Sequence, residues 1–229
     1  MTFQRYAVYY TAPDGPLARF GADWLGWDIA AGCAVLRSEP GGLPVPLDEI
    51  TQAPAKYGFH ATIKPPFRLA HGQTRDALAA AFGALCDGLA PVRLDGLELA
   101  RLGAFLALRP RGETAPLDRL AADVVRTLDR FRAAPTEADL TRRRAAGLTP
   151  RQDELLAQWG YPYVMEEFRF HMTLTGRLPR AHRAQVRTVL ERDLAPLLPA
   201  PFVLDALSLV GEATDGRFHL LHRHALASC

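Results

Sequence analysis

Hydrophobic positions along the chain predict two similar units, each with the order strand, helix, strand, helix, strand. In the first unit, residues 5–10 have the pattern of a buried strand and residues 92–100 alternate like a half-buried one. Pro16 is typical of the first turn of a helix. A second helix is predicted where apolar residues recur with a helical period, at Leu78, Ala81, Phe82, Leu85 and Leu89. The second unit opens with residues 104–110 as a strand, and its first helix buries Leu117, Leu120, Ala121, Val124, Leu128 and Phe131.

Three pairs of short segments repeat in the same order along the chain, which indicates an internal repeat. Residues 16–23 (PLARFGAD) resemble 116–123 (PLDRLAAD), and 93–99 (RLDGLEL) resemble 203–209 (VLDALSL). Between them, His-x-Thr occurs at 60–62 and again at 171–173. We therefore expect one domain of two repeats, about residues 3–100 and about 103–211, followed by a last strand at about 217–224. Two capping-box patterns within about 136–160 predict a helical insertion in the second repeat.

These elements predict an α+β fold. We expect it to be bilobal, with two pseudo-symmetric β-α-β-α-β repeats, mainly antiparallel sheets and a central groove. A doubly wound fold is not expected, because no glycine-rich phosphate loop follows any strand.

Composition narrows the classes of partner. The 229 residues are 48% hydrophobic, which is typical of a globular chain with a real core. With 27 Lys and Arg against 25 Asp and Glu, the net charge of +2 argues against double-stranded DNA or a membrane surface, although it allows a local phosphate pocket. No apolar run approaches the roughly 20 residues of a membrane span, and the N-terminus shows no signal-peptide core. The widely spaced Cys33, Cys86 and Cys229 predict reduced thiols in a cytoplasmic protein, which we expect to be a monomer.

Strand alternation places the histidine and the threonine of each His-x-Thr motif on the same face. In the second motif the core face is formed by Phe168, Phe170, Met172 and Leu174, and the polar face by Arg169, His171, Thr173 and Thr175. In the first motif Lys64 is expected to share the polar face with His60 and Thr62. Brought together about a pseudo-two-fold axis, the two polar faces would line one cleft.

This set of side chains suits the cleavage of a phosphodiester. A neutral imidazole accepts a proton from the attacking oxygen and a protonated one donates to the leaving oxygen, and a pKa near 6.5 makes both forms accessible. Hydroxyls and cations hold the non-bridging phosphate oxygens, so the chemistry requires no metal and no other cofactor. We predict His60 and His171 as catalytic residues. The predicted substrate-binding residues are Thr62, Thr173, Lys64, Thr175, Arg169, Arg143 and Tyr163.

The residues alone leave other interpretations open. The two histidines could be structural, the same pocket could serve a non-catalytic module that binds a cyclic nucleotide or an RNA end, and RNA 2′,5′-end joining would use the reverse chemistry. His219, His222 and His224 suggest a metal, but no nearby acid completes a site, and we predict none.

The paired motifs resemble those of the 2H phosphoesterase superfamily, which includes RNA 2′,5′-ligase-like proteins and cyclic phosphodiesterases. The longer strings YGFHATIKPPFRL and WGYPYVMEEFRFHMTLTGRL resemble, more specifically, a branch of phosphonate-metabolism proteins of carbon–phosphorus lyase operons. The resemblance implies a bilobal fold and metal-independent cleavage of a cyclic phosphodiester, with His60 and His171 as the acid/base pair and Thr62 and Thr173 holding the phosphate. It implies a small phosphorylated sugar or nucleotide as substrate, with an RNA end as an alternative.

Overall fold

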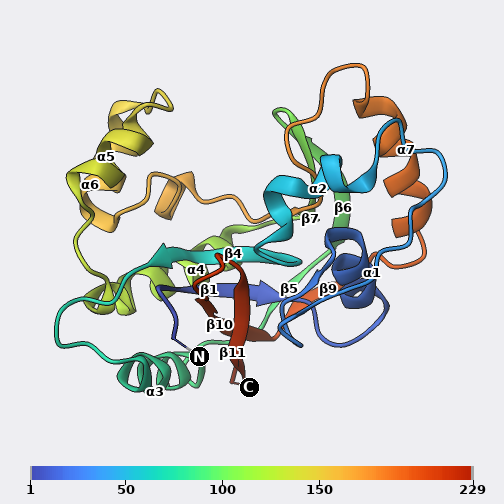
Figure 1. Cartoon of the computed structure of the whole chain (residues 1–229). Coiled ribbons are helices and arrows are strands. Elements are labelled where there is room, and N and C mark those ends of the chain that lie inside the picture. Colours follow the sequence, from blue (N-terminus) through green and yellow to red (C-terminus); the bar gives the residue numbers. More distant parts are fainter. Residues whose placement is uncertain (1, 228–229) are drawn as a thin grey trace.

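A computed structural model describes residues 2–227, and its centre is one seven-stranded antiparallel sheet with the order β11-β10-β1-β4-β8-β7-β6 (Figure 1). The strands are β1 (Arg5–Thr11), β2 (Trp27–Asp28), β3 (Cys33–Ala34), β4 (His60–Phe67), β5 (Val92–Leu94), β6 (Gly96–Leu102), β7 (Phe105–Arg111), β8 (Met172–Thr173), β9 (Phe202–Leu204), β10 (Ala206–Glu212) and β11 (Phe218–Ala225). The helices are α1 (Pro16–Leu25), α2 (Leu47–Ala55), α3 (Arg75–Cys86), α4 (Ala115–Thr127), α5 (Glu137–Arg144), α6 (Pro150–Trp159) and α7 (Arg183–Leu194). The predicted α+β class with mainly antiparallel sheet is confirmed.

Two strands on each side of the contact between β4 and β8 correspond to one another, and β11 is an additional edge strand beyond β10. β1 pairs with β4 on one side, and β7 pairs with β8 on the other. Outside them the two halves of the chain exchange strands, because β10 from the second half pairs with β1 and β6 from the first half pairs with β7. The exchange joins both halves into one sheet. The division into two repeats near residue 100 stays a prediction.

β1 shows how the sheet is buried on both sides. Val8 and Tyr10 belong to the main core, which also contains apolar side chains of α1, α3, α4 and α7. Ala7 and Tyr9, on the opposite face, belong to a smaller cluster with residues of β2, β10 and β11. Burial on both faces explains the nearly continuous apolar sequence of this strand.

Residues 136–160 form the expected helical hairpin. α5 and α6 each begin with a capping box, at Thr136 with Asp139 and at Thr149 with Gln152, and Gly160 ends α6 in the left-handed conformation. In Figure 1 these helices rise from the sheet on one side, and α2 and α7 rise on the other.

The remaining expectations concern the three cysteines and membrane-spanning helices. Cys229 lies outside the described residues, and Cys33 and Cys86 are free thiols. Within residues 2–227 no helix is both long and apolar enough to cross a membrane.

Candidate active site

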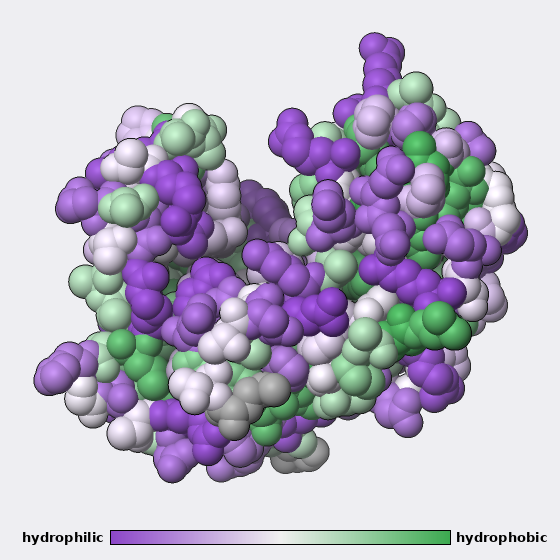
Figure 2. All heavy atoms as spheres, in the orientation of Figure 1, coloured by the Kyte–Doolittle hydropathy of each residue, from purple (hydrophilic) through white to green (hydrophobic). Residues whose placement is uncertain are grey.

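A cleft of about 420 Å³ lies between the two arms of the molecule. Figure 2 shows the corresponding notch between the arm of α5 and α6 and the arm of α2 and α7. Side chains from β1, α2, β4, β7, β8, the insertion and the segments next to them line the cleft. They include Arg5, Tyr9, Pro54, Tyr57, His60, Thr62, Phe105, Arg143, Tyr161, Thr173, Thr175 and Arg177. The cleft thus gathers polar groups from both halves of the chain.

The pairing of β4 with β8 positions the two His-x-Thr motifs against each other. Ala61 and Met172, the central residues of the motifs, are direct partners in the antiparallel ladder. Continuing this register places His60 opposite Thr173 and Thr62 opposite His171, with Cβ atoms of opposite residues about 4.5–5.5 Å apart. Both central residues are fully buried, so the four polar side chains project from the other face of the sheet.

His60 is held in a defined tautomer. Its Nδ1 lies 2.9 Å from the carbonyl oxygen of Gly58, which can only accept, so Nδ1 carries the proton. In the neutral ring Nε2 is then an acceptor, and it lies 3.2 Å from the hydroxyl of Thr62. The ring stacks on Tyr9 with centroids 3.9 Å apart. Burial, together with the nearby charge of His171, lowers the pKa of His60 to about 4.

His171 repeats the local geometry of His60. Its Nδ1 lies 2.8 Å from the carbonyl oxygen of Arg169, again two residues before the histidine. Nε2 is therefore the nitrogen left for a ligand. The ring packs against Phe105, a residue of the cleft wall, with centroids 5.8 Å apart. The two imidazoles thus present the same ring nitrogen from neighbouring strands.

Lys64 does not lie beside His60 and Thr62, contrary to expectation. Its side chain is buried and donates to the carbonyl of Val125 and the carboxylate of Asp129, at 3.1 and 3.3 Å. The cause is a β-bulge in β4. Thr62 pairs with Tyr9, and Lys64, two residues further along β4, pairs with Val8, which is only one residue away from Tyr9 on β1. The extra residue of β4 reverses the alternation, so Lys64 points to the opposite face from Thr62. Burial lowers the pKa of Lys64 to about 8.

Two other predicted binding residues, Thr175 and Arg169, differ in their surroundings. Thr175 lines the cleft, but its hydroxyl accepts from Leu106 N–H at 3.0 Å and donates to the carbonyl of Gly176. Arg169 is exposed outside the cleft lining, and its guanidinium donates to the carbonyls of Glu166 and Phe168. The predicted alternation holds, since Phe168, Phe170, Met172 and Leu174 are buried and Arg169 is exposed. The Arg169 guanidinium nevertheless stays outside the cleft because those two backbone carbonyls hold it.

Tyr161, directly after the insertion, lines the cleft in place of the predicted Tyr163. Arg143 lines the cleft as expected, with its guanidinium 4.6 Å from the ring centroid of Tyr161. Tyr163 is 45% exposed and does not line the cleft. Tyr9, Arg5, Phe105 and Arg177 were missed by the sequence reasoning. Tyr9 could have been found from the alternation of β1, but only once β1 was known to pair with the first motif.

The C-terminal histidines do not form a metal site. His224 bonds to Asp87 at 2.7 Å, whereas His219 packs between Phe3 and Trp27. Within residues 2–227 no group of three or more His, Cys, Asp and Glu side chains could hold a metal ion.

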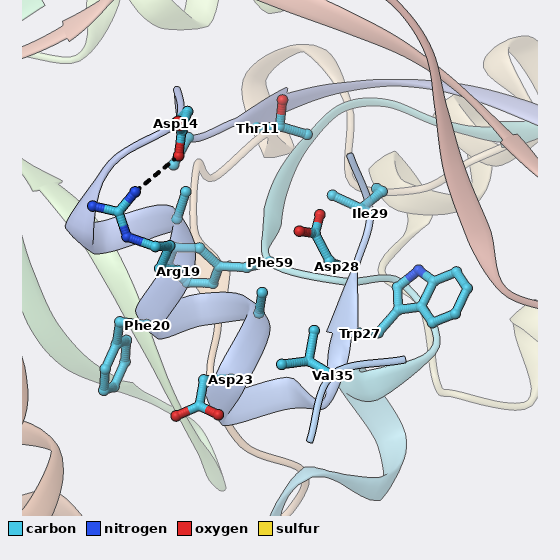
Figure 3. A pocket seen from close by; sticks show the side chains of 13 residues that line it. Thr11, Asp14, Arg19, Phe20, Asp23, Trp27, Asp28, Ile29, Val35 and Phe59 are labelled. Atoms are coloured by element: carbon cyan, nitrogen blue, oxygen red, sulfur yellow. Dashed lines mark hydrogen bonds and ion pairs between the residues drawn. The ribbon is translucent and has the colours of Figure 1, made fainter. Parts of the chain in front are cut away.

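A second cavity of about 460 Å³ lies between α1, the end of β1 and β2 (Figure 3). Its polar groups are mostly acidic: Asp14 is paired with Arg19, and Asp28 accepts from the backbone of Ala30 and Ala31. No histidine lines it. Although slightly larger, this cavity is a poorer phosphate site, because Asp14, Asp23 and Asp28 outnumber its one arginine, Arg19.

Two curated relatives are similar to the chain. Both are named Ribose 1,5-bisphosphate phosphokinase PhnN. The one from Janthinobacterium sp. (strain Marseille) is 38% identical over 218 residues, which are 93% of this chain and 48% of the relative. The one from Laribacter hongkongensis (strain HLHK9) is 38% identical over 177 residues, 76% of this chain and 40% of the relative. The chain therefore spans about half the length, or less, of the curated relatives it matches.

Solved structures and a family model give further matches. E. coli LigT in its apo form matches with a TM-score of 0.45 and 15% identity over all of both chains. A protein described as a phosphoesterase matches with a TM-score of 0.43 and 15% identity, over 99% of this chain and all of that one. At these scores the likeness supports no conclusion about the site. The model of the family described as "Protein of unknown function (DUF1045)" matches residues 62–219, more than half of the sequence, and the chain therefore belongs to the DUF1045 family.

Proposed function

We propose that the chain is a metal-independent phosphodiesterase that cleaves a cyclic phosphodiester of a small sugar or nucleotide. The observation that supports this most strongly is the ladder pair between Ala61 and Met172, because it places the two His-x-Thr motifs on one face of adjacent strands. An imidazole and a hydroxyl from each half of the chain then surround a space that one phosphate can occupy.

Each side chain has a distinct role in this proposal. Nε2 of neutral His60 takes a proton from water as the water oxygen bonds to phosphorus, and Nε2–H of protonated His171 donates to the ester oxygen as its bond to phosphorus breaks. The hydroxyls of Thr62 and Thr173 donate to the non-bridging oxygens, whose charge grows in the transition state. His60 ends protonated and His171 neutral, and exchange with solvent restores both.

The kinase name of the two curated relatives describes proteins about twice as long as this chain. A phosphate-binding loop of the type G-x-x-x-x-G-K-[ST] needs lysine directly after glycine. The two lysines in the 229 residues, Lys56 and Lys64, follow Ala55 and Ile63. We therefore propose that this chain supplies phosphoesterase chemistry and does not itself carry that kinase loop.

The direct test is a panel of 2′,3′-cyclic nucleotides and cyclic sugar phosphates assayed in the presence of EDTA. We expect at least one compound to be opened to a monoester at the same rate with and without the chelator. Loss of all turnover on adding EDTA, restored by a divalent ion, would contradict the metal-independent mechanism. Tight binding of a cyclic phosphate without turnover would favour a binding module instead.

The pH dependence tests which histidine accepts the proton. His60 must be neutral to act as the acceptor, and its pKa is lowered to about 4. Because protonation below that pKa removes the acceptor, kcat/KM should fall as the pH drops through about 4. If His60 were the donor, kcat/KM would instead rise as the pH falls toward 4. Rates measured between about pH 3.5 and 7 distinguish the two assignments, with circular dichroism at each pH to show that the protein stays folded.

A further inference from the structure

A third, smaller cavity adjoins the histidine cleft at the base of the insertion. It has a volume of about 50 Å³ and shares Arg5, Pro66 and Arg143 with the cleft. We call it the arginine niche, because five arginines line it: Arg5, Arg68, Arg132, Arg142 and Arg143. Asp139 is the one carboxylate among its lining residues.

The carboxylates around the niche are too few for its cations. Asp139 pairs with both Arg68 and Arg142, and Asp129 pairs with both Arg132 and Lys64. Glu212 pairs with Arg5. Adding Arg143, six cations thus face three carboxylates, an excess of three positive charges. A local excess of this kind attracts an anion, although the whole chain is nearly neutral.

Arg143 is the cation of the niche with the least compensation. Within residues 2–227 it makes no ion pair, whereas its neighbours Arg142 and Arg144 pair with Asp139 and Asp153. It is half-buried against the ring of Tyr161. Burial lowers the pKa of Arg143, and the nearby charges of Arg142 and Arg5 lower it further. A partly desolvated guanidinium without an acid is unfavourable until an anion binds to it.

The size of the niche limits what that anion can be. Its volume is about 50 Å³, against about 420 Å³ for the histidine cleft. One anionic group fits such a space, whereas a base or a further nucleotide does not. Guanidinium groups match phosphate oxygens with paired hydrogen bonds, so a terminal phosphate is the group that the niche suits best.

We propose that the arginine niche binds a second phosphate of the substrate while the phosphodiester lies in the histidine cleft. This inference rests on the proposed function and narrows it: the preferred substrate is a small sugar or nucleotide that carries a cyclic phosphate and, separately, a terminal monophosphate. The niche adjoins the cleft, because Arg5, Pro66 and Arg143 line both cavities. The proposal places one phosphate of a small molecule on each side of these shared residues.

The test compares two substrates that differ in one phosphate: adenosine 2′,3′-cyclic phosphate and its 5′-phosphorylated form. We expect kcat/KM of the protein to be about 10- to 100-fold higher for the 5′-phosphorylated compound, as charge-assisted hydrogen bonds provide. In Arg143→Gln and in Arg142→Gln this ratio should fall toward one. Arg144→Gln is the matched control, because Arg144 lies on the same helix, pairs with Asp153 and lines neither cavity, and it should keep the ratio. A ratio near one in the unaltered protein, or a ratio that neither variant lowers, would overturn the proposal.

Measurements of binding affinity test the niche proposal independently of the proposed catalytic activity. In the double variant His60→Ala/His171→Ala, calorimetry should still show tighter binding of the 5′-phosphorylated compound, even if neither compound is ever cleaved. If the unaltered protein cleaved both compounds and bound them with equal affinity, the catalytic proposal would be supported and the niche would not be a phosphate site. Activation of the unphosphorylated substrate by added inorganic phosphate would assign the niche to a free anion, against this proposal. Equal or tighter binding of an RNA oligonucleotide, with steep salt dependence, would also contradict it.

Discussion

Replacing His60 or His171 with alanine is expected to lower kcat by ~10²–10⁴-fold, the typical contribution of general acid–base catalysis. His60→Ala removes the ring nitrogen that accepts the proton of the attacking water, and His171→Ala removes the donor to the leaving oxygen. Because both groups act in the same step, the double variant should be little slower than the slower single variant. Steady-state rates on a cyclic phosphate found in the panel provide the measurement.

The control is His222→Ala, which removes an exposed imidazole from β11, away from the cleft lining. Its rate should equal that of the unaltered protein. Each variant should also keep its unfolding transition, because the rings of His60 and His171 are both partly exposed. If both single variants kept full activity on every compound that the protein cleaves, neither histidine would act in the reaction.

Replacing Asp129 with alanine is expected to lower the free energy of unfolding by about 3–5 kcal/mol, the typical cost of leaving a buried charge unpaired. Lys64 is 1% exposed, and Asp129 is its acidic partner in the structure. Arg132, which also pairs with Asp129, would lose its carboxylate as well. Denaturant unfolding monitored by tryptophan fluorescence measures the change.

The companion variant Lys64→Met separates a structural role of this lysine from a substrate-binding one. Methionine fills a similar apolar space, and Asp129 keeps Arg132 as its partner, so the cost in stability should be much smaller than that of Asp129→Ala. KM for a cyclic phosphate should not change, since Lys64 faces away from the cleft. A tenfold or larger rise in KM without loss of stability would show that Lys64 contacts the substrate after all.

The residues that the sequence predicts well are those fixed by short-range alternation. His60, Thr62 and Thr173 line one cleft because each is the immediate neighbour of Ala61 or Met172, which pair with each other and are buried. The capping boxes of α5 and α6 were predictable for the same reason, since a cap depends on residues three positions apart. The α+β class followed from these local signals.

The sequence predictions fail where contacts between distant parts of the chain determine the position of a side chain or strand. The bulge that turns Lys64 away depends on how β4 pairs with β1, and alternation within β4 alone does not reveal it. Arg169 lies on the predicted exposed side, but the backbone carbonyls of Glu166 and Phe168 hold its guanidinium outside the cleft. The exchange of β6 and β10 between the two halves is likewise a long-range choice that local hydrophobic periods do not encode.

The central claim is that both imidazoles act on one phosphorus atom, and the most direct test is a crystal structure with the 2′,3′-cyclic vanadate of a nucleoside, a mimic of the transition state. We expect Nε2 of His60 and Nε2 of His171 each to lie about 2.6–3.2 Å from oxygens bound to the same vanadium. A vanadate bound to only one of the two rings, or bound elsewhere on the protein, would contradict the account.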